Sequence, residues 1–206
     1  MVATSLCFGR RHCHKADSRP PCPPGLLLLL QGAKRPSISR QKPGMVAKCK
    51  RDQEFDMTAL LILNGPNLNV LGVRQPEVYG STTLTEVEAA CQTHAAAQQV
   101  ALSFRQSNHE GQLIDWIHAA RGTQDGIILN AGAYTHTSVA LMDAISSAEV
   151  PTIELHLSNI HAREELRHQS FIAKVAIGVI CGFGPHGYLL AIDAMLAHLK
   201  NHGGQR

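Results

Sequence analysis

The sequence alternates short apolar runs with longer stretches of helical periodicity, and this alternation restricts the possible folds more than any other feature. Apolar runs typical of buried strands occur at 59–63, 100–105, 126–130, 151–156 and 176–180. Helical patterns follow at 84–99, 110–121, 137–148 and 188–200, and a shorter helix is predicted to open at Arg163, after the fourth run. Strands that alternate with helices in this way build a parallel sheet with helices on both faces.

Five strands are too few to close an eightfold barrel, so the sheet is expected to be open. The sequence therefore predicts an α/β, flavodoxin-like fold, in which an open five-stranded parallel sheet lies between two helical layers as a three-layer sandwich. No internal repeat or second folded domain is evident, and we assign residues 57–206 to a single domain.

The first 56 residues differ in composition from the rest. They carry 11 Lys and Arg against 4 Asp and Glu, and six of the ten prolines, whereas residues 57–206 carry 8 basic and 12 acidic residues. The net charge of +3 thus averages two unlike parts and does not indicate nucleic-acid binding. We predict a disordered extension. Met57 lies two residues before the first strand and is a natural start, which would place the extension upstream of the native protein.

Two functional alternatives for the extension stay open. It could be a basic arm for an acidic partner. It could also bind zinc, although its histidine and cysteine spacing fits no standard site; the candidate ligands are His12, Cys13, His14 and Cys22.

The sequence predicts a cytoplasmic protein without a membrane segment. The apolar run Leu26–Leu30 is shorter than the core of a signal peptide and far shorter than a membrane span. Cys91 falls in a predicted helix and Cys181 ends a predicted strand, so each is expected to be a small buried apolar residue. This cysteine usage fits a reducing compartment.

Polar segments follow each of the first four predicted strands. Because the carboxyl ends of parallel strands meet at one edge of an open sheet, where ligands bind, these segments predict a polar small-molecule site. The alternative is that Asn, Gly and Ser serve only as turn residues. The side chains expected at this edge are Asn64, Asn67, Ser107, Asn108, His109, Glu110, Asn130, His136, His156, Ser158 and Arg163.

These residue types suit proton transfer better than phosphate or metal binding. No glycine-rich phosphate loop and no acidic cluster follow the first strand. Zinc is disfavoured because His136, His156 and His161 lack thiolate or carboxylate partners at ligand spacing. His156 ends a strand and could act as a general acid or base, although both it and His136 could equally make purely structural hydrogen bonds.

Two more segments bear on the site. Arg163 and Arg167 are four residues apart on a predicted helix, so both can hold a carboxylate or simply form a solvated face. The polar segment 72–84 is typical of an active-site lid. It carries Arg74 and Tyr79, and a guanidinium near a tyrosine favours the phenolate, which would make Tyr79 a base rather than a hydrophobic closure.

Several long motifs resemble one family, type II 3-dehydroquinate dehydratase. The resemblance covers residues 59–200 in order and implies a lyase that removes water from 3-dehydroquinate to give 3-dehydroshikimate, in the shikimate route to aromatic amino acids. It also implies that no metal or organic cofactor is needed, and that the chain forms trimers and a dodecamer without nucleic-acid or membrane partners. The motifs are LNGPNLNVLG…RQPEVYG, QSNHEGQLIDWIHAA, ILNAGAYTHTSVALMDA, IELHLSNIHAREELRHQSF and GVICGFGPHGYLLAI.

The resemblance also implies a role for each residue that matches the family's motifs. Tyr79 would be the phenolate base, and Arg74 would lower its pKa and stabilise the transition state. His156 would protonate the departing hydroxyl, and Asn67 would hold a water against the enolate oxygen. The implied substrate-binding residues are Asn130, His136 and Arg167 for the hydroxyls, Leu157 and Ser158 for the carboxylate, and Asp143 for the site of a neighbouring subunit.

The sequence departs from the family at few positions. Gln75 stands where many members have glutamate, and Pro185 and His186 are unusual at the start of the last helix. A lysine Schiff base, used by the unrelated type I enzymes, is disfavoured because Lys174 and Lys200 lie away from the predicted edge. The competing interpretations are another lyase or isomerase of a polyhydroxy-carboxylate and a non-catalytic flavodoxin-like binding module. Biosynthetic and quinate-catabolic roles stay open.

Overall fold

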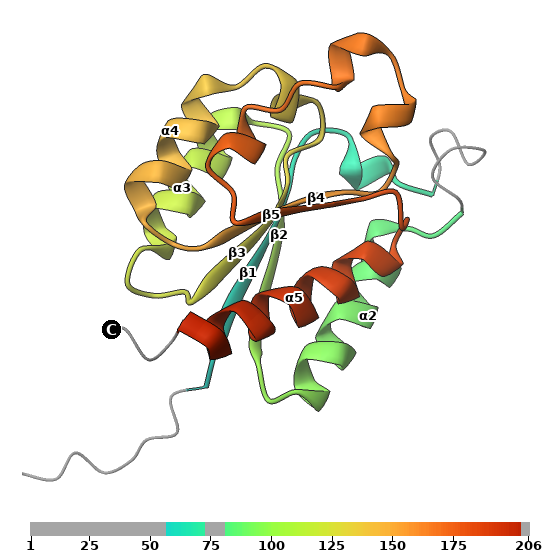
Figure 1. Ribbon diagram of the computed structural model, residues 1–206. Helices are drawn as coiled ribbons and strands as arrows, with labels where there is room; N and C mark the ends of the chain where they lie inside the picture. Colours follow the sequence, from blue (N-terminus) through green and yellow to red (C-terminus); the bar gives the residue numbers. More distant parts are fainter. Residues whose placement is uncertain (1–56, 73–80, 203–206) are drawn as a thin grey trace, which may run out of the picture. The chain divides into compact units, whose positions relative to one another are not determined.

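Five parallel strands form the centre of the fold, in the order β2–β1–β3–β4–β5 (Figure 1). The computed structural model describes residues 57–72 and 81–202. The strands are β1 (Ala59–Asn64), β2 (Ala101–Gln106), β3 (Gly126–Asn130), β4 (Thr152–His156) and β5 (Gly178–Cys181). The predicted open parallel α/β fold is confirmed, and each strand boundary lies within two residues of the expected one.

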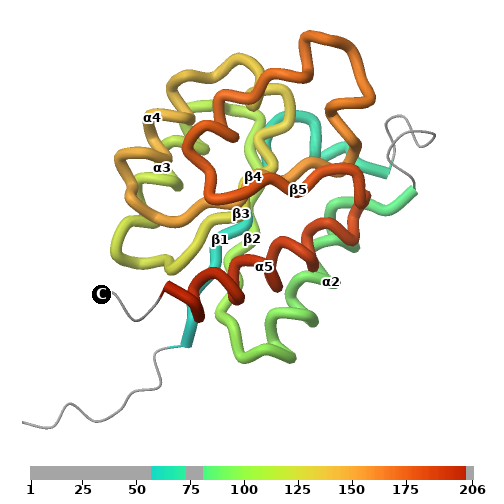
Figure 2. Tube along the Cα trace, viewed as in Figure 1, coloured from blue at the N-terminus to red at the C-terminus, as the bar shows by residue number. Residues whose placement is uncertain are grey.

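Helices cover both faces of the sheet, as the three-layer prediction requires (Figure 1). Helices α2 (Leu84–Ala97) and α5 (His186–His202) pack on one face, and α3 (Glu110–Ala120) and α4 (Val139–Ala148) pack on the other. The chain trace shows the same pairing, with α2 beside α5 and α3 beside α4 (Figure 2).

The sheet has two apolar faces because side chains alternate along each strand. In β1, Leu60 and Ile62 belong to the core under α2 and α5, whereas Leu61 and Leu63 belong to the core under α3 and α4. All four are at most 4% exposed. A strand buried on both faces is apolar at every position, which explains why the sequence shows continuous apolar runs.

A capping box stands at the start of α2. The Thr83 side chain accepts a hydrogen bond from the backbone N–H of Glu86, and the Glu86 carboxylate accepts one from the backbone N–H of Thr83. The hydrogen bonds that the backbone N–H and the hydroxyl of Thr83 donate to the Glu86 carboxylate lower the pKa of Glu86. Capping therefore defines where the helix begins.

The short helix predicted to open at Arg163 is not an α-helix. Two 3-10 turns stand there instead, η3 (Ile160–Ala162) and η4 (Glu165–Arg167). The backbone between them is extended at Arg163 and Glu164, which prevents a continuous helix. This extended link lets the Glu164 carboxylate pair with the arginines on both sides of it.

The cysteine prediction holds for one residue and is wrong for the other. Cys91 is fully buried in α2, and burial raises the pKa of its thiol to about 12. Cys181 ends β5, an edge strand, and is only partly buried because no further strand covers it. In the described part of the chain no helix has the length and apolar character needed to cross a membrane.

Candidate active site

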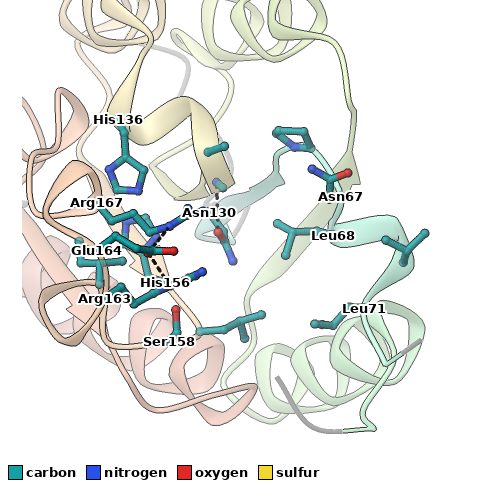
Figure 3. Close-up of a pocket in the computed structure, with 16 residues that line it drawn as sticks. Asn67, Leu68, Leu71, Asn130, His136, His156, Ser158, Arg163, Glu164 and Arg167 are labelled. Atoms are coloured by element: carbon teal, nitrogen blue, oxygen red, sulfur yellow. Dashed lines mark hydrogen bonds and ion pairs between the residues drawn. The ribbon is translucent and has the colours of Figure 1, made fainter. Parts of the chain in front are cut away.

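A cavity of about 280 Å³ opens at the carboxyl ends of the strands (Figure 3). Its walls come from segments that follow β1, β3 and β4, which is where an open parallel sheet binds ligands. Figure 3 shows Asn67 and Leu68 on one side, Arg163, Glu164 and Arg167 on the other, and Asn130 between them. The predicted residues that line the cavity are Asn67, Asn130, His136, His156, Leu157, Ser158, Arg163 and Arg167.

The turn after β1 presents Asn67 on a tightly held backbone. A Cβ at Gly65 would collide with the carbonyl oxygen of Ala131, so only glycine fits against the end of β3. Asn67 adopts a left-handed conformation with φ of 66°, which asparagine tolerates better than most residues. Its backbone N–H donates to the side-chain oxygen of Asn108 at 2.9 Å. The turn is thus pinned from both neighbouring strands.

A buried hydrogen-bond network lies beneath the cavity and was not predicted. The Tyr188 hydroxyl, from α5, donates to Oδ1 of Asn64 at 2.6 Å and accepts from Nδ2 of Asn130 at 3.0 Å. Asn64 in turn donates to the carbonyl oxygen of Arg105 at 3.1 Å. Burial raises the pKa of Tyr188, so its hydroxyl stays protonated. The network fixes the amide of Asn130, the one member that reaches the cavity.

His156 carries a buried acidic partner that the sequence analysis missed. Glu154 precedes it by two residues in β4, and this spacing places both side chains on the same face. Oε1 of Glu154 lies 2.7 Å from Nε2 of His156, and their side chains are 0% and 6% exposed. A carboxylate accepts the Nε2 proton, which leaves Nδ1 for the cavity. Glu-x-His in a buried strand was the signal that could have revealed this pair.

His136 is held in a complementary way. It ends η2 (Gly132–His136), and its Nδ1 lies 2.7 Å from the carbonyl oxygen of Gln169. A carbonyl only accepts, so Nδ1 carries the proton and Nε2 is left for the cavity. The rings of His136 and His156 are stacked, with centroids 6.2 Å apart and planes inclined by 13°. Two imidazoles with defined orientations thus face one space.

The opposite wall supplies the charge. Glu164 Oε2 lies 3.0 Å from Nε of Arg167 and 3.6 Å from Nε of Arg163. A hydrogen bond from its own backbone, and then the side-chain bond from Arg167, lower the pKa of Glu164. Among the described residues that line this wall, two guanidinium groups stand against one carboxylate, and this balance favours an anionic ligand. Glu164 was not predicted from the sequence.

Other predicted residues lie elsewhere. Asp143 is exposed on α4 and does not line its own chain's cavity. Lys174 and Lys200 are also absent from the lining. Arg74, Gln75 and Tyr79 lie outside the described residues, as does the whole extension 1–56. Throughout 57–72 and 81–202, no group of three or more His, Cys, Asp or Glu side chains could hold a metal ion.

Comparison with known proteins agrees with this architecture. The family model described as dehydroquinase class II matches residues 58–196. The 3-dehydroquinate dehydratase of Ruegeria pomeroyi is 62% identical over 149 residues, which cover 72% of this chain and all of that protein. The 3-dehydroquinate dehydratase of Dinoroseobacter shibae is 64% identical over 140 residues, covering 68% of this chain and 93% of that protein.

A solved structure supports the same relationship. The crystal structure of type II dehydroquinase from Butyrivibrio crossotus is similar with a TM-score of 0.66 and 40% sequence identity, over 68% of this chain and 97% of that one. The sheet order, the cavity at its carboxyl edge and the match over residues 58–196 all agree with this similarity. The chain belongs to the class II dehydroquinase family.

Proposed function

We propose that this protein catalyses the dehydration of 3-dehydroquinate to 3-dehydroshikimate, the activity in the names of its relatives. The observation that carries the proposal is the buried Glu154–His156 pair, which faces a cavity with a positively charged wall. Such a pair can donate a proton, and such a wall attracts an anionic substrate. The same proposal includes a place in the shikimate route to aromatic amino acids, in the cytoplasm.

The reaction needs a base for the C–H bond next to the ketone, and we assign this role to Tyr79 as phenolate. Arg74 would favour that phenolate and stabilise the developing negative charge. Leu71 lines the cavity, so segment 73–80 follows the cavity wall directly in the sequence. Removal of the proton leaves an enolate, and a water held by the Asn67 amide would stabilise its oxygen.

His156 completes the elimination as the general acid. The enolate electrons form the new carbon–carbon double bond as the carbon–oxygen bond to the hydroxyl breaks. The hydroxyl takes a proton from Nδ1 of His156 and leaves as water. Glu154, hydrogen-bonded to Nε2, stabilises the charged ring and fixes its orientation. None of these reaction steps requires a metal, an organic cofactor or a lysine.

The remaining cavity residues would bind and orient the substrate. Asn130, His136 and Arg167 present one amide, one imidazole and one guanidinium for its hydroxyls. Leu157 and Ser158 follow β4 directly and would bind the carboxylate through backbone N–H groups. This division places the charged end of the substrate near the strand end and its ring between the histidines and Asn67.

The full-length protein tests the proposal directly. It should convert 3-dehydroquinate, without added metal or cofactor, to a product with the ultraviolet absorbance of a conjugated enone. Borohydride should not inactivate it, because no imine forms. If folded protein left 3-dehydroquinate unchanged while acting on a different polyhydroxy-carboxylate, the proposed substrate would be wrong.

We further propose that Asp143 acts in the site of a neighbouring copy, within a trimer that assembles into a dodecamer. Its exposed position on α4, away from its own cavity, fits a role between subunits. Asp143→Ala should lower kcat/KM and weaken the assembly, measured by steady-state kinetics and by light scattering. Unchanged kinetics with an unchanged oligomer would contradict the shared site.

A further inference from the structure

Two neighbouring residues hold the two cavity imidazoles, Gln169 by a direct hydrogen bond and Ser170 through Glu154. The carbonyl oxygen of Gln169 accepts from Nδ1 of His136 at 2.7 Å. The hydroxyl of Ser170 lies 2.9 Å from each oxygen of Glu154, which is itself 2.7 Å from Nε2 of His156. The rings of His136 and His156, which come from different elements, therefore depend on one short stretch of chain.

The Ser170 hydroxyl has a defined direction. The backbone N–H of Ala173 donates to Oγ of Ser170 at 2.8 Å, so this oxygen is an acceptor on one side. Its own proton then points to the carboxylate of Glu154. The backbone N–H of Phe171 donates to the carbonyl oxygen of Thr135 at 2.9 Å, which ties the stretch to the turn that carries His136. Both contacts restrict how far Ser170 can move.

The Glu154 carboxylate needs this hydroxyl because it is fully buried. A buried charge is costly unless hydrogen bonds compensate it, and its side-chain partners among the described residues are His156 and Ser170. Without the hydroxyl, one donor would remain for two oxygens, and the carboxylate could rotate away from the imidazole. The orientation of His156 would then no longer be unique.

We infer that Ser170 is a positioning residue for His156, acting through Glu154. It holds the carboxylate where it accepts the Nε2 proton, and this keeps Nδ1 turned to the cavity. The consequence for catalysis rests on the proposed function, in which His156 protonates the departing hydroxyl. Ser170 itself touches no reacting atom.

Ser170→Ala tests this role. We expect kcat to fall roughly 10- to 100-fold with KM little changed, a smaller effect than the loss of the general acid itself. Protonation of the departing hydroxyl becomes slower, so the solvent deuterium isotope effect on kcat should rise. The isotope effect from substrate deuterated at the carbon that loses its proton should fall. A merely structural role would reduce the active fraction and leave both isotope effects unchanged.

Three matched variants complete the kinetic test. Ser170→Thr keeps the hydroxyl and should restore most of kcat. Ser170→Cys keeps the shape with a weak donor, and it replaces the alanine variant if that variant does not fold. Ser146→Ala removes a hydroxyl whose one hydrogen bond within residues 57–72 and 81–202 is to the carbonyl oxygen of Met142 in its own helix, and it should leave kcat unchanged.

Hydrogen–deuterium exchange at the imidazole C2 positions, followed by mass spectrometry, tests the same role without turnover. In Ser170→Ala the exchange rate at His156 should change, whereas that at His136 should not, because the Gln169 carbonyl remains. Equal rates at His156 in both proteins, together with unchanged kcat, would overturn the inference. If the wild type does not act on 3-dehydroquinate, the proposed function fails, and the exchange rates still decide whether Ser170 positions His156.

Discussion

Two cavities lie at opposite edges of the sheet, and the smaller one carries the proposed chemistry. The cavity at the carboxyl ends of the strands has a volume of about 280 Å³. The one at the amino ends has a volume of about 750 Å³ and is lined by segments that precede β1, β3 and β4. Size alone would choose the edge opposite to the proposed site.

One ion pair at each edge shows a difference in exposure to water. At the amino edge Arg121 pairs with Glu149 at 2.6 Å, but their side chains are 62% and 70% exposed. At the carboxyl edge Glu154 pairs with His156 almost completely out of water. Water weakens the first interaction and leaves the second strong. Buried, partnered titratable groups therefore identify the candidate site better than volume does.

The largest effect on kcat is expected from substitution of a histidine at the carboxyl edge, whereas a histidine substitution at the amino edge should have none. His156→Asn removes the proposed general acid and should lower kcat by about 10²- to 10⁴-fold. His198→Asn changes a histidine of the amino-edge cavity and should leave kcat unchanged. Steady-state kinetics measures kcat of both variants. Equal values of kcat would contradict the difference between the two edges.

Substitution of the paired glutamates should also lower kcat at the carboxyl edge and not at the amino edge. Glu154→Gln keeps the shape of the side chain but removes the carboxylate that fixes His156, so we expect kcat to fall roughly 100-fold. Glu149→Gln at the amino edge should have no kinetic effect. A glutamine at 154 that preserved full turnover would show that the buried charge has no catalytic use.

Tyr188→Phe should affect stability more than chemistry. It leaves Oδ1 of Asn64 and Nδ2 of Asn130 without their buried partner, and we expect a loss of about 1–3 kcal/mol in the free energy of unfolding. KM should also rise, because the Asn130 amide is no longer held. Tyr134→Phe removes a hydroxyl bonded at a more exposed site and should cost less. Denaturant unfolding of both variants measures the difference.

The smallest effect is expected for the exposed ion pair. Arg121→Gln should change the free energy of unfolding by about 1 kcal/mol or less, because exposed pairs contribute little. Its remaining contribution should vanish at high salt, and kcat should be unchanged. A large loss of stability in denaturant titrations would show that the amino edge is more than a solvated surface.

Much of the fold could be predicted from the sequence because local patterns determine it. The strand at 126–130 and the start of α2 at Thr83 depend on apolar runs and capping residues that are visible in the chain. The extended backbone at Arg163 and Glu164 was not predicted this way, because residue types that favour a helix stand there and the local pattern does not show where a helix is interrupted.

In the candidate site, too, some features could be predicted from the sequence and others could not. The sequence by itself determined that Asn67, Asn130 and His156 meet at one edge, because each follows or ends a strand of a parallel sheet. Only the tertiary structure decided which partners from distant parts of the chain hold this site. Tyr188 reaches Asn130 across 58 positions of the chain, and Ser170 reaches Glu154 across 16. Such contacts depend on how helices and turns pack against strand ends, and no local pattern in the sequence records that packing.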